Sequence, residues 1–458
     1  MILMNKKIIQ KSKYPVTVFK QKIKMQRGRF GHRPRNDPHY YNGIYPFIQT
    51  GNVVKASESN EKIKYTQTLN ALGLSTSRLF DKKVLVITIA ANIGYTAILD
   101  YAACFPDSLV ALTLKDSDLS LEYLNIYIRL IRKYIENLAP QAAQKNINLK
   151  QLGKLPIIVP DKDIQQEIVS IMEEAYSKKN QLENEAQVLL ESIDNYLLQE
   201  LGIVRPLEEI NILQNRMFYA SSNKVLGNRF DPRKYNNKYQ RLFAAIEDTP
   251  FPKKHLKDLL VDSVSGNWGK EDTVEDQKLV SCLAIRATEF DNKYNLNLDN
   301  HRVKFRKYDP ETYEKIKLSS EDILIEKSGG SENQPVGRVA FIEKEMVEKQ
   351  SLAFSNFIQK IVVNKEEASP RYVYEYLRLI HNIKITEVMQ TQTNGIRNLI
   401  MGEYFNTTII LPKKSQQILI TEKILKKRKH VLEIEKQVDQ IIERAKMQVE
   451  KILLGNNL

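Results

Sequence analysis

The stretch SLEYLNIYIRLIRKYIENLAP at 120–140, continued by QKNINLKQLGKLPIIVP at 144–160, occurs a second time in this chain. The second copy reads SPRYVYEYLRLIHNIKI at 369–385 and TNGIRNLIMGEYFNTTIILP at 393–412. A single long repeat indicates a duplicated domain, because the repeats of solenoid proteins have far shorter periods.

The two copies align through tyrosines, an arginine, a proline and a pair of glutamines. Tyr123 and Tyr372, Tyr127 and Tyr376, and Arg129 and Arg378 are each 249 positions apart (376 − 127). Asn148-Leu149 match Asn398-Leu399 at an offset of 250, Pro160 matches Pro412 at 252, and Gln165-Gln166 stand roughly opposite Gln416-Gln417. We interpret the two Asn-Leu pairs as structural, with the asparagine holding a loop against the following strand.

Each copy is followed by a long segment with helical periodicity and no internal proline or glycine. Apolar residues recur every seven positions, and such a heptad seam requires a partner helix. In the first segment the rows are Ile168, Ala175, Leu182 and Leu189, beside Met172, Lys179, Ala186 and Ile193. In the second segment the row is Val431, Val438, Ala445 and Ile452, with Ile434 and Ile441 beside it. Gly202 suits the C-cap of the first helix.

These patterns predict a mixed α/β (α+β) fold in which two globules are joined by two long antiparallel coiled-coil helices. The predicted domains are a first globule at 1–160, a central helix at 161–202, a second globule at 203–412 and a C-terminal helix at 413–458. Antiparallel packing buries both seams and relates the two halves by a pseudo-twofold. At about 1.5 Å per residue, each helix would reach on the order of 60 Å.

Local signals predict the elements of each globule. VLVITIAANIGYTAIL, from Val84, indicates two antiparallel strands joined by a turn, and ILIEKSGG at Ile323 begins the corresponding pair. YPFIQTGNVV indicates a strand that ends in a Gly-Asn turn, and Ser120 suits a helix N-cap. We align Arg229-Phe230 with Arg29-Phe30, because NRFDPRKYN resembles RFGHRPRND.

The composition points to an acidic partner. The net charge of +14 favours nucleic acid first and a membrane surface second, although lysine-rich surfaces also occur without such a partner. The two cysteines, Cys104 and Cys282, cannot form a thiolate metal cluster or a disulfide framework, which indicates a reducing compartment. The opening MILMNKKIIQKSKYP has no apolar core of a signal peptide, so we expect a cytoplasmic protein.

Signatures of catalysis are missing from the sequence. There is no GxxxxGK[ST], no G-x-G-x-x-G after a strand, no HExxH and no GxSxG, and the six histidines are scattered. Asp262 and Glu271 near Lys270 could form a nuclease site, but a solvated surface is the favoured interpretation of such neighbours. We therefore assign no catalytic residue and no metal ligand.

Sequence-specific DNA binding requires Arg, Lys, Asn and Gln at base edges, with further cations on phosphates. Any one of the candidates could be an ordinary solvated side chain, so the clusters carry more weight than their members. In the first half the candidates are Lys24, Arg27, Arg29, Arg33 and Arg35, followed by Gln49 and Asn52 at a strand end. In the second half they are Arg229, Arg233, Lys234, Trp268, Lys270, Arg286, Lys327, Asn333 and Arg397.

The order of motifs resembles the specificity subunit of Type I restriction-modification systems. The resemblance rests on PFIQTGNV, the strand pair from Val84, NINLKQLGKLPIIVP followed by DIQQEI, and their second copies. It implies two target-recognition domains, each of which reads one half of a bipartite, asymmetric site in double-stranded DNA. The helix pair would set the spacing between the half-sites and dock two methyltransferase subunits.

The same resemblance assigns the chemistry to other chains. The methyltransferase subunits would use S-adenosylmethionine as a DNA adenine methyltransferase, a restriction motor-nuclease subunit could join them, and this chain would hold no cofactor. RGRFGHRPRNDP also resembles recognition domains of single-chain restriction–modification enzymes. Two alternatives stay open. The chain could be a nuclease with a site near Asp262 and Glu271, or a coiled-coil scaffold that binds random DNA as well as any other.

Overall fold

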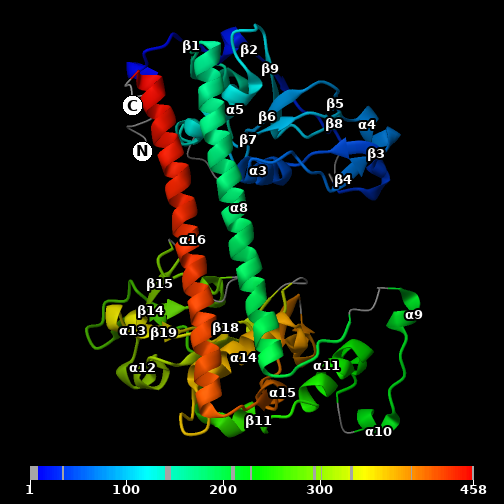
Figure 1. The fold of residues 1–458 in the computed structure, drawn as a ribbon, viewed down its shortest axis with the longest axis vertical. Coiled ribbons are helices and arrows are strands. Elements are labelled where there is room, and N and C mark those ends of the chain that lie inside the picture. Colours follow the sequence, from blue (N-terminus) through cyan, green and yellow to red (C-terminus); the bar gives the residue numbers. More distant parts are fainter. Residues whose placement is uncertain are drawn as a thin grey trace. The chain divides into compact units, whose positions relative to one another are not determined.

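The computed structural model describes residues 9–32, 36–139, 146–207, 212–226, 229–291, 295–300, 302–330, 334–393 and 395–455. The chain divides into two units. Unit 1 comprises Met1–Gln187 and Leu432–Leu458, and unit 2 comprises Val188–Val431. The two long helices, α8 (Lys162–Glu200) and α16 (Lys414–Leu454), each contribute one part to unit 1 and the other part to unit 2 (Figure 1).

Unit 1 contains three sheets and several short helices. The strands are β1 (Val16–Val18), β2 (Ile23–Arg27), β3 (Tyr41–Phe47), β4 (Gln67–Leu69), β5 (Leu79–Phe80), β6 (Val84–Thr88), β7 (Thr96–Leu99), β8 (Ala103–Cys104), β9 (Leu109–Leu114) and β10 (Pro156–Ile158). The helices are α2 (Phe19–Lys22), η1 (Pro38–Tyr40), α3 (Thr50–Ser59), α4 (Ala71–Ser75), α5 (Leu121–Leu130), α6 (Arg132–Glu136) and α7 (Leu149–Leu152). The strand orders are β2-β9-β6-β7, β4-β3-β8-β5 and β1-β10.

Unit 2 is built in the same way with one additional sheet. Its strands are β11 (Lys253–His255), β12 (Leu260–Ser265), β13 (Lys270–Glu271), β14 (Val280–Ile285), β15 (Lys304–Tyr308), β16 (Ile323–Glu326), β17 (Ser328–Gly329), β18 (Val339–Phe341), β19 (Leu352–Phe354), β20 (Ile358–Val363), β21 (Gln390–Thr393), β22 (Ile396–Leu399) and β23 (Thr408–Ile410). Its helices are α9 (Leu213–Arg216), α10 (Ser222–Val225), η2 (Pro232–Tyr235), α11 (Asn237–Glu247), η3 (Leu256–Leu259), η4 (Ala287–Glu289), α12 (Pro310–Ile316), α13 (Lys344–Lys349), α14 (Pro370–Asn382), η5 (Ile385–Met389) and α15 (Met401–Phe405). The strand orders are β12-β20-β16-β18, β13-β15-β14-β19, β11-β23 and β17-β22-β21.

The sheets confirm the predicted duplication and the mixed α/β fold class. The antiparallel sheet β12-β20-β16-β18 repeats the order β2-β9-β6-β7, and β11-β23 repeats β1-β10. In the mixed sheets, β14 pairs with β19 in parallel and with β15 antiparallel, as β3 pairs with β8 and β4. The predicted strand pair from Val84 is confirmed as β6 and β7, which pair antiparallel with Val84 opposite Leu99.

The central strand of each antiparallel sheet is buried on both faces, so alternate side chains enter different cores. In β6, Leu85 and Ile87 belong to the core beneath α5, whereas Val84 and Val86 belong to the core beneath α3. In unit 2, Ile323 and Ile325 of β16 share a core with α14, and Leu324 enters the core beside β19. The period of two in the side-chain directions of a strand explains this division.

Hydrogen bonds from the repeat tyrosines fasten the first helix of each copy to the strand that follows it. Tyr123 donates to the carbonyl oxygen of Ile158 at 3.0 Å, and Tyr127 donates to that of Pro156 at 3.1 Å. Their counterparts do the same in unit 2, Tyr372 to Ile410 at 2.6 Å and Tyr376 to Thr408 at 3.0 Å. Ser120 also caps α5 as predicted, because its hydroxyl accepts from the Tyr123 N–H at 3.1 Å.

A buried glutamine joins each long helix to its globule. The amide oxygen of Gln165 accepts from the Ser120 N–H at 2.9 Å, and its nitrogen donates to the Pro160 carbonyl at 2.8 Å. Gln417 makes the matching bonds, with the Ser369 N–H at 2.9 Å and the Pro412 carbonyl at 2.9 Å. The glutamines of the repeat therefore connect the start of one helix to the start of another.

We expect Gln417→Leu to lower the free energy of unfolding by about 2–3 kcal/mol, because it removes the partner of the half-buried Ser369 N–H and of the buried Pro412 carbonyl. Gln416→Leu is the matched control, since that neighbouring side chain is exposed and should change stability by less than about 0.5 kcal/mol. Urea denaturation of the full chain would compare them. Equal effects of the two substitutions would contradict the structural role of Gln417.

The heptad seams are confirmed by burial and by contacts of the two helices within each unit. Ile168, Ala175, Leu182 and Ile193 of α8, and Val431, Val438 and Ala445 of α16, are all at most 8% exposed. Within unit 1, residues Met172 and Ala175 share a core with Ala445 and Val449. Within unit 2, Lys427 donates to the Ser192 hydroxyl at 2.7 Å, and Lys423 lies 3.8 Å from Glu200.

The two helices pack antiparallel within unit 2. Ser192 of α8 contacts Lys427 of α16, whereas the later residue Glu200 contacts the earlier residue Lys423. Gly202 ends α8 as predicted. Its φ of +67° is a conformation that glycine adopts at low cost, and the Ile203 N–H returns to the Leu198 carbonyl at 2.9 Å.

Two local predictions were wrong. Gly51 and Asn52 do not form a turn after β3. They lie in the first turn of α3, where the Asn52 side chain accepts from the Gln49 N–H at 2.8 Å and stabilises a helix start. The alignment of Asn148 with Asn398 is displaced by two residues, since the Ile147 N–H donates to Ile89 and the equivalent donor in unit 2 is Leu399, to Lys327.

The alignment of Arg229-Phe230 with Arg29-Phe30 is also wrong. The Gly28 N–H donates to the Leu109 carbonyl at 2.9 Å after β2, and the Gly266 N–H donates to the Ile358 carbonyl at 3.1 Å after β12. Gly28-Arg29-Phe30 therefore corresponds to Gly266-Asn267-Trp268. The shared dipeptide Arg-Phe misled the alignment, because its second copy precedes η2 and lies outside the repeated sheets.

Candidate nucleic-acid interface

A hollow of about 400 Å³ opens at the end of β3 in unit 1, and we term it the first hollow. Its lining includes Phe30, Gln49, Thr50, Gly51, Gln67, Pro106 and Ser108. Gln49 directly precedes α3, and its amide nitrogen donates to the side-chain oxygen of Gln67. The exposed amide of Gln49 can therefore offer both a donor and an acceptor to a ligand at this surface.

A hollow of about 770 Å³ opens at the end of β14 in unit 2, and we term it the second hollow. Its lining includes Asn267, Trp268, Arg286, Thr288, Ser328, Asn356 and Phe357. The carboxylate of Glu289, which is buried, accepts from Arg286 Nη2 at 2.7 Å and from Nε at 3.2 Å. This fixed pair orients the Arg286 guanidinium, which lies 5.8 Å from the centre of the Trp268 ring.

The two hollows are formed by equivalent positions of the repeat. Gln49 and Arg286 each precede a helix, and each backbone N–H donates to a side chain three residues later, Asn52 at 2.8 Å and Glu289 at 2.6 Å. Phe30 comes two residues after Gly28, the glycine that follows β2. Trp268 likewise comes two residues after Gly266, the glycine that follows β12. The pairs of equivalent lining residues are Phe30 and Trp268, Gln49 and Arg286, Thr50 and Ala287, Gly51 and Thr288, Pro106 and Ser355, and Ser108 and Phe357.

Close backbone approach at these sites requires the two glycines. A Cβ atom at Gly28 would collide with the carbonyl oxygens of Phe105 and Pro106, and one at Gly266 would collide with those of Phe354 and Ser355. The backbone thus holds the same position in both units, while the side chains around it differ. The two hollows therefore have different hydrogen-bonding groups. The first hollow has Gln49 beside Phe30, and the second hollow has Arg286 beside Trp268.

The remaining candidates of the first half lie on β2 and just beyond it. Lys24 and Arg29 are exposed, and Arg27 is half-buried with its Nε lacking a hydrogen-bond partner among the described residues. Arg33 and Arg35 lie outside the described residues. The structure thus brings Gln49 to the first hollow, uses Asn52 to stabilise the start of α3, and leaves the basic residues on and just after β2 as a separate group.

The candidates of the second half are divided among several places. Arg229 pairs with Asp231, Lys234 Nζ lies 3.6 Å from Glu403, and Arg233 is exposed beside them. Lys270 pairs with Asp309 at 3.3 Å. Asp231 and Glu403 therefore reduce the net positive charge of the cluster at 229–234.

Three further candidates differ in accessibility. Lys327 donates to the Ser265 hydroxyl, and burial lowers the pKa of its ammonium group. Arg397 is only 8% exposed. Asn333 lies outside the described residues. Among the second-half candidates that the structure describes, Trp268 and Arg286 alone line the second hollow.

Sequence reasoning missed Phe30, Ser108, Asn267 and Phe357 as lining residues. One signal could have found two of them, namely the pattern of glycine, any residue and an aromatic residue after a strand, which occurs at Gly28 and Gly266. Ser108 and Phe357 carry no such signal, because they reach the hollows from strand connections that are distant in sequence.

Two residues of the suggested nuclease site, Glu271 and Lys270, are engaged with other partners. Glu271 lies 2.5 Å from Arg306, and Lys270 pairs with Asp309. Across the described ranges, no three His, Cys, Asp or Glu side chains gather as a metal site would require. In the same ranges no helix is both long and apolar enough to cross a membrane.

A family model described as the Type I restriction modification DNA specificity domain matches residues 28–192. The matched range begins at Gly28, includes every lining residue of the first hollow, and ends inside α8. The resemblance recognised in the sequence is confirmed over this segment, and the repeated sheets give unit 2 the same construction as the matched part of unit 1.

Solved structures with a similar fold include the S subunit of a Type I restriction-modification system from M. genitalium. It is 14% identical, with 96% of each chain covered and a TM-score of 0.44. A structure described as showing complex assembly and conformational transition of the type I R-M system is 10% identical, covers 97% of this chain and 98% of its own, and has a TM-score of 0.49. The HsdS subunit from Thermoanaerobacter tengcongensis is 12% identical, with 97% of each chain covered and a TM-score of 0.35.

Proposed function

We propose that this chain is the DNA sequence-recognition subunit of a Type I restriction-modification complex and has no catalysis of its own. Residues 1–160 and 203–412 would each read one half of a bipartite, asymmetric site in double-stranded DNA. The helices at 161–202 and 413–458 would set the spacing of the half-sites and dock two methyltransferase subunits. These subunits would supply S-adenosylmethionine chemistry on adenine, and restriction motor-nuclease subunits would join the same complex.

The observation that carries the proposal is the equivalence of the two hollows with different residues at the same position. Glu289 and the Arg302 carbonyl engage Nε and Nη2 of Arg286, so its Nη1 group remains to donate to the O6 or N7 acceptor of guanine in the major groove. A glutamine amide offers one donor and one acceptor, which match N7 and N6 of adenine. Two equivalent sites with different edge-reading groups are suited to an asymmetric bipartite sequence.

The net charge of +14 supplies the other requirement of DNA binding. Cations that contact phosphates contribute affinity without sequence preference. Two exposed cations, Lys24 on β2 and Arg29 just after it, are suited to this role. We therefore assign base reading to Gln49 and Arg286 and phosphate contacts to exposed cations around the hollows.

We expect Arg286→Ala to relax the recognised motif at one base of one half-site, and Gln49→Ala to relax it at one base of the other. Each base contact should contribute roughly 5- to 150-fold of discrimination, which is 1–3 kcal/mol. The measurement is methylome sequencing of a host that carries this chain with its neighbouring methyltransferase gene. Each variant has an internal control, because the opposite half of the motif should stay unchanged.

Lys344→Ala is the matched control for loss of a cation, since Lys344 is exposed on α13 and pairs with Glu348 at 3.5 Å. It should leave both halves of the motif intact. If deletion of the whole chain left every modified motif of the host in place, the proposed function would be contradicted. In that case cleavage of DNA by the purified chain with magnesium, or equal binding of random-sequence DNA, would favour the nuclease or the scaffold.

A further inference from the structure

The repeat arginine of unit 2 lies in a closed network of opposite charges. Arg378 Nη2 donates to Asp194 Oδ1 at 2.6 Å, and its Nε donates to Glu375 Oε2 at 3.1 Å. The same Glu375 oxygen accepts from Arg428 at 2.8 Å. Two arginines and two carboxylates therefore balance one another where α14 packs against the long helices.

Both carboxylates are missing at the equivalent place in unit 1. The counterpart of Arg378 is Arg129, and the counterpart of Glu375 at the same offset of 249 is Ile126. The helix offset of 252, fixed by Gln165 and Gln417, makes Lys446 the counterpart of Asp194. An apolar residue and a cation thus replace the two anions.

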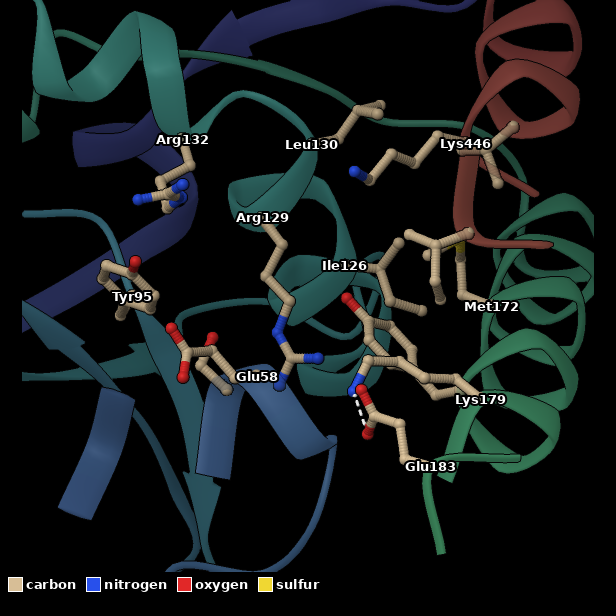
Figure 2. A pocket seen from close by; sticks show the side chains of 14 residues that line it. Glu58, Tyr95, Ile126, Arg129, Leu130, Arg132, Met172, Lys179, Glu183 and Lys446 are labelled. Carbon is tan, nitrogen blue, oxygen red and sulfur yellow. Dashed lines mark hydrogen bonds and ion pairs between the residues drawn. The ribbon is translucent and has the colours of Figure 1, made fainter. Parts of the chain in front are cut away.

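A cavity of about 450 Å³ lies at this place in unit 1, between the globule and the two long helices (Figure 2). Four cations line it, namely Arg129, Arg132, Lys179 and Lys446. The carboxylates in the lining are Glu58 and Glu183, and Glu183 already pairs with Lys179 at 2.7 Å. The Lys446 ammonium also lies 2.8 Å from Glu443, a pair on the exposed side of α16. The cavity therefore carries an excess of positive charge.

Arg129 is held in place by neutral partners. Its Nη1 donates to the Asn60 side-chain oxygen at 2.8 Å, its Nη2 donates to the Thr96 carbonyl at 3.2 Å, and its guanidinium lies 5.3 Å from the Tyr176 ring centre. Burial lowers the pKa of this guanidinium. Among the described residues no carboxylate lies within ion-pair distance of it. A desolvated cation without a counter-ion is unfavourable, and an anionic ligand would relieve that cost.

Apolar and aromatic side chains form the rest of the wall. Ile126, Leu130 and Met172 lie beside Tyr176, and Arg132 stacks on Tyr95 with 4.4 Å between guanidinium and ring centre. The volume lies within the range of sites for small organic ligands and exceeds what a single carboxylate or phosphate ion would fill. A ligand that combines an anionic group with a flat or apolar part fits this lining.

We propose that the cavity of unit 1 binds a phosphate-bearing small molecule of about nucleotide size, with the phosphate on Arg129 and Lys446. The inference goes beyond DNA reading, because the cavity shares no lining residue with the first hollow. Unit 2 has no such need, since Asp194 and Glu375 occupy the equivalent positions as permanent anions.

The test is isothermal titration of the full chain with adenosine 5′-monophosphate, with adenosine as the uncharged probe and inorganic phosphate as the minimal anion. We expect saturable binding of the monophosphate, weaker binding of phosphate and no binding of adenosine. Lys446→Asp restores the anion found in unit 2 and should weaken the monophosphate at least about tenfold. Lys436→Asp, an equal charge change at an exposed position of the same helix, should leave its affinity within about twofold.

Several outcomes would overturn the proposal. These are no saturable binding of either phosphate probe, equal affinity for adenosine and its monophosphate, or equal loss in the two lysine variants. Competition with a random-sequence DNA duplex separates the two sources of phosphate. Displacement of the monophosphate by the duplex would show that the cavity receives the DNA backbone and not a small molecule.

Discussion

Insertion of one heptad into both long helices is expected to move DNA binding from the natural site to a site with a longer spacer. Seven residues lengthen a helix by about 10 Å, which corresponds to roughly three base pairs of DNA. The insertions belong after Gln187 in α8 and after Val431 in α16, where the chain divides into its units. An in-phase heptad continues both buried seams, so each helix keeps its apolar face toward the other.

Binding of the lengthened chain to the original spacing should fall by about 100-fold or more, because only one half-site can then be occupied. Three additional base pairs also rotate one half-site by roughly 100°, so the best new site should bind less tightly than the natural one. In the control, the seven residues next to each insertion point are replaced by the inserted sequence, so that the length of each helix stays the same. Unchanged preference for the original spacer would show that the helices do not measure the distance.

Glu375→Ala is expected to destabilise the chain by about 3–5 kcal/mol, because it leaves Arg378 and Arg428 without a shared counter-ion in a buried position. The Glu375 side chain is fully buried, and the side chains of the two arginines are 6% and 15% exposed. The measurement is the free energy of unfolding from urea denaturation of the full chain. Removal of the side-chain volume of Glu375 without loss of its charge would destabilise the chain by less than this.

The matched control for this substitution is Glu367→Ala, which removes an exposed ion pair with Lys254. Its side chains are 39% and 44% exposed, so the expected change is below about 1 kcal/mol. Glu375→Gln keeps the hydrogen-bonding shape without the charge and should fall between the two. If Glu375→Ala and Glu367→Ala had equal effects, the buried network would not stabilise unit 2 through its charge.

The contrast between these two units follows from a small number of replaced residues. Where unit 2 has Glu375 and Asp194, unit 1 has Ile126 and Lys446, and the repeat arginine is kept in both. Duplication preserved the tyrosine and glutamine hydrogen bonds that hold each globule to its helix. It did not preserve the charge balance beneath them, and the cavity of unit 1 lies where that balance is absent.

The long helices and their seams could be predicted because their causes are local and periodic. Apolar residues every seven positions, Ser120 as a cap and Gly202 after the last turn each act within a few residues of their own backbone. The strand pair from Val84 is equally local, since its turn joins the two strands directly. Such features do not depend on where the rest of the chain goes.

The site residues could be predicted only in part. Gln49, Trp268 and Arg286 were chosen for their chemistry, and the structure places them at equivalent hollows. Arg229 was chosen by the same chemistry but lies against Asp231. Sequence shows which side chains can read a base or bind a phosphate, but not which of them have a carboxylate as a neighbour.

By itself, the sequence determined that this protein is a duplicated pair of α/β globules with two long seam-forming helices, because repeat, period and capping are properties of neighbouring residues. Only the tertiary structure decided which residues correspond between the copies and which charges are neutralised. Arg378 meets Asp194 across 184 positions of sequence, and Gln49 meets Ser108 at one hollow through two different strand ends. Contacts over such separations depend on how the sheets and helices pack, and insertions between them shift the register that a sequence alignment follows.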